Sequence, residues 1–141
     1  MSTPNQFIFA RGIRGRMHRM RYDWLKKQVA EPADDYTLFE LGCFDCRSLS
    51  ILPKPRAYVG ADAGWEGGIN DAQMSYVKTP WVELVVAQSV HDLTAFEGRK
   101  FDYSIAMKTL EFIPDSIWST VKILCQLTKR ILFRAVRQNS L

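Results

Sequence analysis

The sequence has little cysteine or histidine and no long apolar run. Of its 141 residues, three are cysteine and two are histidine. An odd cysteine count without framework spacing argues against a disulfide-stapled secreted domain, so we expect reduced thiols. No apolar stretch approaches the ~20 residues that a membrane-spanning helix needs. Residues 1–16 contain no apolar core long enough for a secretory signal. These absences lead us to expect a cytoplasmic protein.

Ligands for a metal ion are also few. Cys43 and Cys46 have C-x-x-C spacing, but a tetrahedral zinc site would need two more ligands from Cys125, His91 and His18. These three form no second closely spaced pair, so we expect no metal site. A redox-active thiol pair at a helix N-terminus is the alternative. The simpler expectation is two small, half-buried residues in a turn.

Acidic residues are nearly missing from the first part of the chain. Residues 1–30 carry seven Lys or Arg and one acid, Asp23, whereas the other residues carry twelve against fourteen. From Arg16 to Ala30, apolar residues recur at helical spacing, which predicts an amphipathic helix packed on the body through Met20 and Trp24. Such a helix can meet phosphate, acidic lipid or an acidic protein, or simply present a solvated face. We expect a basic helical segment at 1–35 and a domain at 36–141.

The rest of the chain alternates between strand-like and helix-like segments. Strands are predicted at 37–42, 57–62, 82–88, 101–107 and 130–136. Helices are predicted at 46–52, 67–77 and 114–127. This alternation predicts a three-layer α/β sandwich with a mainly parallel sheet of about five strands, covered on both faces.

The turn after the first predicted strand lacks the glycines of a phosphate-binding loop. In the dinucleotide pattern G-x-G-x-x-G, Gly42 would be the first glycine, and Phe44 and Arg47 occupy the other two positions. Phe44 would block the close approach of a pyrophosphate, and Asp45 would repel it. Dinucleotide and P-loop phosphate binding are therefore disfavoured, and with them a nicotinamide-dependent oxidoreductase.

A nucleoside ligand without a pyrophosphate meets neither obstacle. Asp62 ends the second predicted strand, twenty residues after Gly42. In a parallel α/β sheet, a carboxylate at this place can accept hydrogen bonds from the two ribose hydroxyls. The alternative is an ordinary strand-end aspartate that caps the next turn.

Four stretches in order resemble the class I S-adenosylmethionine-dependent methyltransferases, within them the small bacterial methyltransferase-domain type. The stretches are FELGCFDCRSL, YVGADAGWEGG, FDYSIAMKTLEFIPD and KRILFRAV, and the resemblance they carry covers about 100 of the 141 residues, from 37 to 136. The resemblance implies a Rossmann-like fold, S-adenosyl-L-methionine as cofactor, and methyl transfer to an acceptor that the sequence does not identify. A small molecule, a saccharide or a lipid precursor is expected.

The resemblance also implies a set of residues that contact the cofactor. These are Glu40, Gly42, Cys43, Phe44, Asp62, Ala63, Trp65, Gln88, Met107 and Lys108.

Their implied roles differ along the cofactor. Glu40 and Gly42 would lie near its methionine amino group, and Asp62 would hold its ribose. Gln88 would read the adenine amino group, which Ala63 and Trp65 would flank. The backbone of residues 43–44 would line the loop beneath the cofactor, and residues 107–108 would border the reactive methyl group. His91 and Glu111 are the candidate general bases, with a loop histidine and a helix-start carboxylate as the alternatives.

This sequence departs from the family's pattern in ways that keep other functions open. The family's sheet has seven strands, and the last two are expected to be absent here. That would leave the strand at 130–136 as an apolar edge that the N-terminal helix, a second copy or another protein covers. A degenerate cofactor-binding subunit without turnover is the first alternative. A nucleic-acid methyltransferase that uses the basic helix is the second, although nucleic acid is not favoured.

Overall fold

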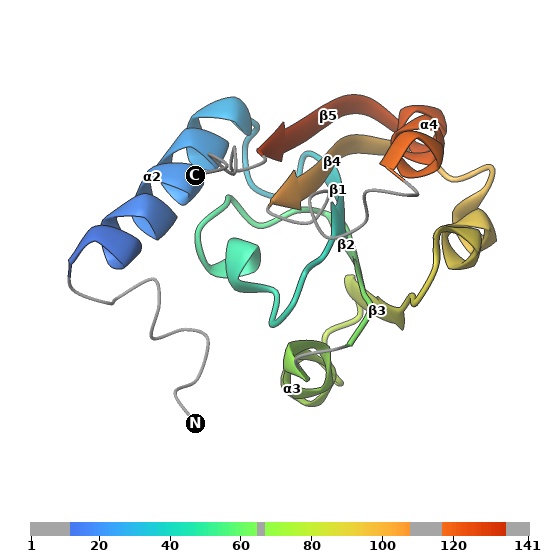
Figure 1. Ribbon diagram of the computed structural model, residues 1–141, viewed down its shortest axis with the longest axis horizontal. Coiled ribbons are helices and arrows are strands. Elements are labelled where there is room, and N and C mark those ends of the chain that lie inside the picture. The colour runs from blue at the N-terminus through green and yellow to red at the C-terminus, as the bar shows by residue number, and fades with distance from the viewer. Residues whose placement is uncertain (1–11, 65–66, 108–116, 135–141) are drawn as a thin grey trace, which may run out of the picture.

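Five parallel strands form one sheet at the centre of the molecule (Figure 1). The computed structural model describes residues 12–64, 67–107 and 117–134. The strands lie in the order β3-β2-β1-β4-β5. Their bounds are β1 Thr37–Leu41, β2 Ala57–Asp62, β3 Val82–Val86, β4 Phe101–Met107 and β5 Thr128–Arg134. The predicted α/β class with a parallel five-stranded sheet is confirmed.

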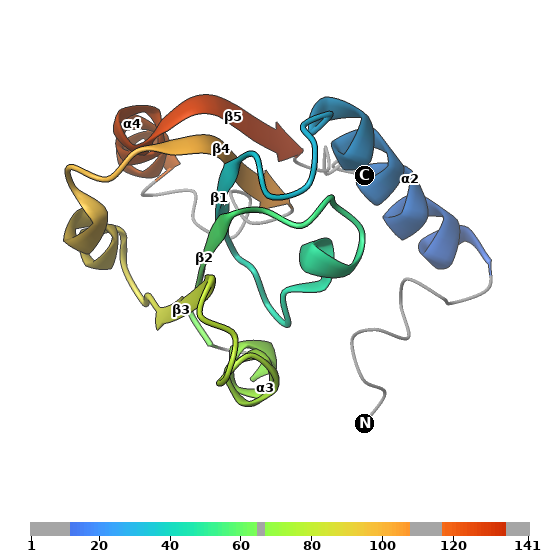
Figure 2. The ribbon, with the colours of Figure 1, turned by 180° about the vertical axis from the view of Figure 1, so that it is seen from behind.

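Helices cover both faces of this sheet, as Figures 1 and 2 show from opposite sides. The helical elements are α2 Ile13–Gln28, the 3-10 helix η1 Arg47–Ser50, α3 Gly68–Ser75, the 3-10 helix η2 Val90–Phe96 and α4 Ile117–Leu127. One buried cluster joins α2, η1 and α3 to the sheet, and a second joins η2 and α4 to its other face. The molecule therefore has three layers, as the alternation of segments predicts.

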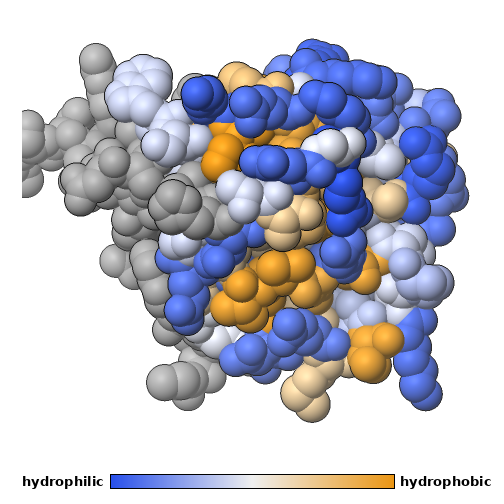
Figure 3. Space-filling view, turned by 90° about the vertical axis from the view of Figure 1, so that its right-hand side faces the viewer, coloured by the Kyte–Doolittle hydropathy of each residue, from blue (hydrophilic) through white to orange (hydrophobic). Residues whose placement is uncertain are grey.

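The two-residue period of each strand divides the core between these layers. In β1, Leu38 belongs to the cluster under α2 and α3, and Phe39 belongs to the cluster under η2 and α4. Both side chains are fully buried. This continuous apolar character is what a parallel strand buried on both faces requires. On the side of α4 and η2, Figure 3 shows apolar side chains that reach the surface between hydrophilic ones.

The predicted bounds of β2 and β4 are confirmed residue for residue. The predicted helix at 46–52 is only a four-residue 3-10 helix, η1. Cys46, its N-cap, has a left-handed backbone with φ of 60°, and the ring of Pro53 clashes with a longer helix. Helix α4 passes directly into β5 at Thr128, so the fifth strand begins two residues before the predicted start.

Helix α2 packs on the body through only one of the two residues predicted for this contact, Trp24. Leu25 and Val29 are fully buried in the core cluster, and Trp24 packs partly buried against it. Met20 is 52% exposed, so the predicted contact through Met20 is wrong. Apolar residues lie on two sides of this helix, and their spacing alone does not tell which side faces inward. No helix within residues 12–64, 67–107 and 117–134 combines the length and apolar character of a membrane span.

Candidate functional site

The order of the strands reverses between β1 and β4. The carboxyl ends of these two strands, with that of β2 beside β1, therefore lie at one edge of the sheet. From β1 the chain moves outward through β2 to β3, and it returns to the other side of β1 with β4. In open parallel sheets, ligands bind outside the carboxyl ends of the strands at this switch point. The candidate site therefore consists of the loops that follow β1, β2 and β3.

Asp62, the last residue of β2, joins the first two of these loops. One carboxylate oxygen accepts a hydrogen bond from the backbone N–H of Phe44 at 2.9 Å. The other accepts one from the backbone N–H of Gly64 at 2.8 Å. The backbone carbonyl of Asp62 also accepts from the N–H of Ala87, just beyond β3, at 2.8 Å. Asp62 thus links the ends of β1, β2 and β3.

A carboxylate that accepts two hydrogen bonds still has capacity for a ligand. Its two oxygens offer about four lone-pair sites, and two of these are occupied by the backbone donors. Asp62 is only half-buried, so solutes reach it. This observation fits the predicted contact with two ribose hydroxyls, and it shows that the alternative role of capping a turn is also fulfilled by the same side chain.

The backbone N–H groups of the loop after β1 are directed to the protein itself. Those of Gly42 and Cys43 donate to the carbonyl of Ala61, that of Cys46 donates to the carbonyl of Cys43, and that of Phe44 donates to Asp62. Phosphate-binding loops instead aim such groups at the ligand. The loop geometry therefore agrees with a nucleoside and disfavours a pyrophosphate.

Two residues of this loop keep a backbone conformation that normally belongs to glycine. Phe44 has φ of 52° and Cys46 has φ of 60°, beside Gly42 at 73°. Left-handed backbone is costly for residues that carry a Cβ, and such strain concentrates at functional sites. The loop has thus lost the later glycines of the family's first motif but retains the turn that they would allow.

The ring of Phe44 is held between two neighbours. A Cβ atom added at Gly68, the first residue of α3, would lie 2.7 Å from two of its ring carbons. On another side, the guanidinium of Arg47 lies 5.1 Å from the ring centroid, a cation–π distance. Arg47 also forms an ion pair with Asp45 at 3.0 Å, and both side chains are 11% exposed. These contacts fix the loop against α3.

Glu40 is a buried carboxyl in the middle of this region. It is 4% exposed, and its Oε2 atom accepts hydrogen bonds from the hydroxyls of Ser48 and of Tyr58, the latter at 2.5 Å. Burial raises the pKa of Glu40 to about 7, although the two hydrogen bonds act in the opposite direction. A buried carboxyl whose pKa is shifted this far is a candidate functional group.

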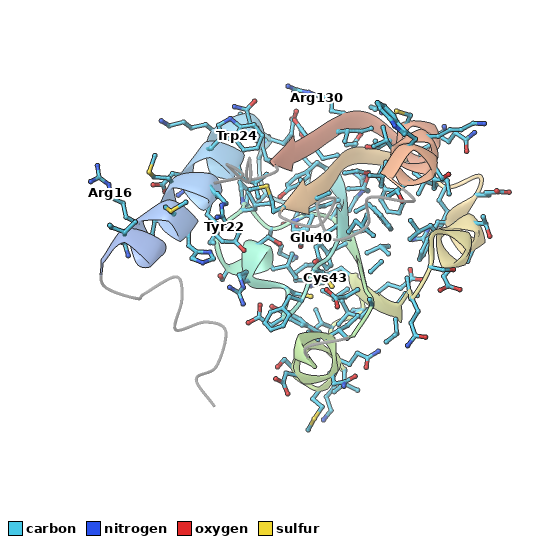
Figure 4. All side chains as sticks on the ribbon, viewed as in Figure 1. Arg16, Tyr22, Trp24, Glu40, Cys43 and Arg130 are labelled. Carbon is cyan, nitrogen blue, oxygen red and sulfur yellow. The ribbon has the colours of Figure 1, made fainter. Side chains whose placement is uncertain are left out.

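Helix α2 brings a phenol to the same region. Tyr22 lies within the electrostatic influence of Glu40, Arg47, Asp45 and Arg21. Burial is the main cause that raises the pKa of Tyr22, and the negative charge of Glu40 is the next. Figure 4 shows Tyr22 on the side of α2 that faces the sheet, where Glu40 lies. Helix α2 therefore covers the loop after β1.

The C-x-x-C cysteines lie inside this loop and are not exposed. Cys43 and Cys46 are 2% and 1% exposed, and both are free thiols. The neighbouring Cys46 and burial raise the pKa of the Cys43 thiol far above its usual range. The Sγ atom of Cys43 fills the space beside Gly60, where an added Cβ would be 2.9 Å from it. Buried thiols of this kind are structural, and no group of metal-ligating side chains occurs among residues 12–64, 67–107 and 117–134.

The structure locates the other predicted residues only in part. Ala63 is half-buried between Asp62 and Gly64, and Gln88 is exposed two residues beyond β3. The backbone N–H of Gln88 donates to Asp92. Met107 ends β4 and packs against the core cluster that contains both loop cysteines.

The side chains of four predicted site residues are not described by the structure. His91 lies in η2, but its side chain is not described. Trp65, Lys108 and Glu111 lie outside the described residues. No candidate general base is therefore assigned.

Sequence reasoning missed the partners of the site residues. Tyr58 and Glu40 could have been paired, because their positions on adjacent strands put them on the same face of the sheet. The packing of Phe44 on Gly68 had a weaker signal, the double glycine at 67–68. Nothing in the sequence indicated that Tyr22 would lie beside Glu40.

Comparisons with known proteins identify the fold. No protein-family model matches the sequence, and no curated protein matches it either. Among solved structures, WbdD, a bifunctional kinase-methyltransferase, matches 93% of this chain at a TM-score of 0.60 and 20% identity, over 31% of its own chain.

Two further solved structures match in the same way. An S-adenosylmethionine-dependent methyltransferase from Clostridium acetobutylicum matches 79% of this chain and 48% of its own, with a TM-score of 0.61 and 16% identity. The N-terminal domain of EvdMO1, solved with SAH bound, matches 81% of this chain and 47% of its own, with a TM-score of 0.59 and 18% identity.

The chain spans less than half the length of these solved chains, between 31% and 48%. The likeness confirms the predicted fold: this chain has the Rossmann-like fold of S-adenosylmethionine-dependent methyltransferases.

Proposed function

We propose that this protein binds S-adenosyl-L-methionine at the carboxyl ends of β1 and β2 and transfers its methyl group to a small acceptor. The observation that carries the proposal is the half-buried carboxylate of Asp62, which closes the loop after β1 and keeps lone pairs for a ribose. An S-adenosylmethionine-dependent methyltransferase with the same fold supports it, and so does the N-terminal domain of EvdMO1, which was solved with SAH bound.

The residues present fit such a cofactor in four respects. Asp62 would hold the ribose hydroxyls, and the loop at residues 42–46 would lie beneath the cofactor without offering N–H groups to a phosphate. Ala63 would flank the adenine from the loop after β2, and Gln88 would read its amino group from the loop after β3. Glu40 would lie near the methionine amino group, where ionisation of its buried carboxyl would be favoured by the positive charge.

The bound cofactor would supply an electrophilic methyl group for in-line displacement. The contribution of this chain is to orient the two reactants and to exclude water. Helix α2, with Tyr22 facing Glu40, would exclude water from the loop after β1. His91 and Glu111 remain candidates for a general base, and a small molecule, a saccharide or a lipid precursor remains the proposed acceptor.

The proposal also covers the domains of the chain, its location in the cell and its partners. Residues 36–141 would form the methyltransferase domain and residues 1–35 a basic segment, in a protein that acts in the cytoplasm. The N-terminal helix, which contacts β5, a second copy or another protein would cover β5, which within the described residues pairs only with β4.

Calorimetry with S-adenosylmethionine, S-adenosylhomocysteine and NAD tests the proposal. We expect binding of the two sulfur compounds, little binding of NAD, and at least tenfold weaker binding by Asp62→Asn, about 1.4 kcal/mol. Asp102→Asn is the matched control, because Asp102 also accepts a backbone hydrogen bond, from Thr37 at 2.9 Å, but at the opposite end of the sheet. Equal binding by both variants would remove Asp62 from the site.

Cofactor binding without turnover is the second candidate function. The loop that lost its glycines to Phe44 and Cys46 favours it, because both residues add side chains where the family has none. If this function is right, S-adenosylhomocysteine binds to the protein. No labelled methyl group is then transferred from S-adenosylmethionine to any acceptor until a partner protein is added.

A further inference from the structure

Helix α2 carries a second apolar row that is turned away from the body. Ile13, Met17 and Met20 are 80%, 44% and 52% exposed. They follow one another at intervals of four and three residues, which places them in one row along the helix. Leu25 and Val29, on another side of the same helix, form the buried contact with the core. Trp24, four residues after Met20 in the same row, packs against that core, so the row is exposed only in its first part, from Ile13 to Met20.

Positive charge accompanies this row. Helix α2 contains six Lys or Arg residues and one acid. Arg16, four residues before Met20, and Lys27, seven residues after it, lie on the same side as Met20 and are exposed, and the one acid, Asp23, lies between Met20 and Lys27 on this side and is also exposed. Figure 4 shows Arg16 directed away from the body near the start of the helix. We call Ile13, Arg16, Met17, Met20 and Lys27 together the outer face of α2.

We propose that the outer face of α2 docks onto the headgroup region of an anionic membrane. Helices that lie in the interface of a membrane combine an apolar row with Lys and Arg beside it. Each basic residue near an anionic surface strengthens binding by about fivefold. The apolar side chains then enter the boundary between headgroups and acyl chains. This inference does not depend on the proposed methyl transfer.

The charge of the helix disfavours a second copy of the chain as the occupant. Two copies would bring two strongly basic helices together, and like charges repel. The row from Ile13 to Met20 is also short, about 10 Å at ~1.5 Å per residue. Stable protein interfaces bury about 800 Å² on each partner, which is more than this row supplies. A membrane surface needs no such fixed area.

The kind of apolar residue disfavours nucleic acid. Binders of single strands stack bases on exposed aromatic side chains, whereas the outer face of α2 exposes isoleucine and methionine. Binding to duplex phosphates depends on charge and salt alone. Binding to a duplex would therefore not change if the methionines were replaced by polar residues. Substitution of the methionines thus distinguishes a membrane from nucleic acid as the partner.

Vesicle flotation of the full chain tests the proposal, with equimolar phosphatidylglycerol and phosphatidylcholine as the anionic probe and pure phosphatidylcholine as the neutral one. Arg16→Gln/Lys27→Gln removes two charges, and Met17→Ser/Met20→Ser removes the apolar row. Met74→Ser/Val77→Ser is the matched control, because these residues on and after α3 are 79% and 76% exposed and lie apart from the outer face. Circular dichroism checks that each variant is folded.

We expect flotation with anionic vesicles that weakens with salt and is much weaker with neutral ones. The charge variant should bind about 30-fold more weakly, the methionine variant about tenfold more weakly, and the control within twofold of the wild type. No flotation with anionic vesicles would overturn the proposal. So would equal losses in the methionine variant and the control, or DNA binding that the charge variant weakens and the methionine variant leaves unchanged.

Discussion

The carboxylate of Asp62 at the end of β2 accepts a hydrogen bond of 2.9 Å from the backbone N–H of Phe44 in the turn after β1. The two residues are 18 positions apart in the chain, and the contact fixes one loop of the candidate site to the next strand. The same carboxylate belongs to the proposed ribose contact. Any test of Asp62 must therefore separate loss of ligand binding from loss of loop structure, which is the purpose of the Asp102 control.

Substitution of Glu40 should change how stability depends on pH. The pKa of Glu40 rises from 4.5 to about 7 on folding, mainly because it is buried. The stability tied to its protonated form is fully present below pH 4.5 and is lost as the pH rises through 7. Glu40→Gln keeps an acceptor for Ser48 and Tyr58 without a charge. Relative to the wild type, its free energy of unfolding should increase by about 3 kcal/mol between pH 4.5 and pH 8.

Urea denaturation of both proteins at several pH values measures this difference. Other titrating groups are common to the two proteins and cancel in the comparison. A difference that stays constant from pH 4.5 to pH 8 would show that the carboxyl of Glu40 titrates normally in the folded protein.

Gly68→Ala should destabilise the protein although alanine favours helices over glycine by roughly 1 kcal/mol. The added Cβ would lie 2.7 Å from the ring of Phe44, and such overpacking costs about 1–3 kcal/mol. The cost should fall when Phe44→Leu is combined with it, because a smaller side chain leaves room. A double-mutant cycle by chemical denaturation gives the coupling, and an identical cost in both backgrounds would mean that Phe44 does not pack on Gly68.

The three cysteines should differ in their reactivity toward a thiol reagent such as Ellman's reagent. Cys125 is exposed, whereas Cys43 and Cys46 are buried, and the pKa of Cys43 is raised. Native protein should show one fast thiol, and unfolded protein three. In Cys125→Ser the fast phase should vanish. If that variant still reacts rapidly, the C-x-x-C pair is accessible and the redox alternative gains support.

Local patterns predicted the fold well wherever tertiary packing agreed with them. The bounds of β2 and β4 followed from apolar and β-branched runs between turn residues. The contact of α2 through Trp24 was predicted correctly, whereas the contact through Met20 was predicted wrongly because apolar residues occupy two sides of this helix. Only the docked structure shows that Leu25 is buried and Met20 is not.

The proximity of the loops after β1 and β2 could be predicted because parallel strands place their ends together. That rule put Gly42 and Asp62 near each other, and the structure joins their loops. Sequence could not show that Phe44 and Cys46 adopt left-handed backbone, because propensity argues against it and the surrounding contacts override propensity. Nor could it show Tyr22 beside Glu40, which depends on how a helix from the start of the chain docks.

The most direct test of the nucleoside site is a titration of ¹⁵N-labelled protein with S-adenosylhomocysteine, followed by amide chemical shifts. We expect the largest shifts at the carboxyl ends of β1, β2 and β3, at Phe44, Gly64 and Gln88. We expect almost none at the amino ends of β1 and β4, at Thr37 and Asp102. Shifts confined to the amino ends, or no saturable shifts at all, would contradict the proposed nucleoside site.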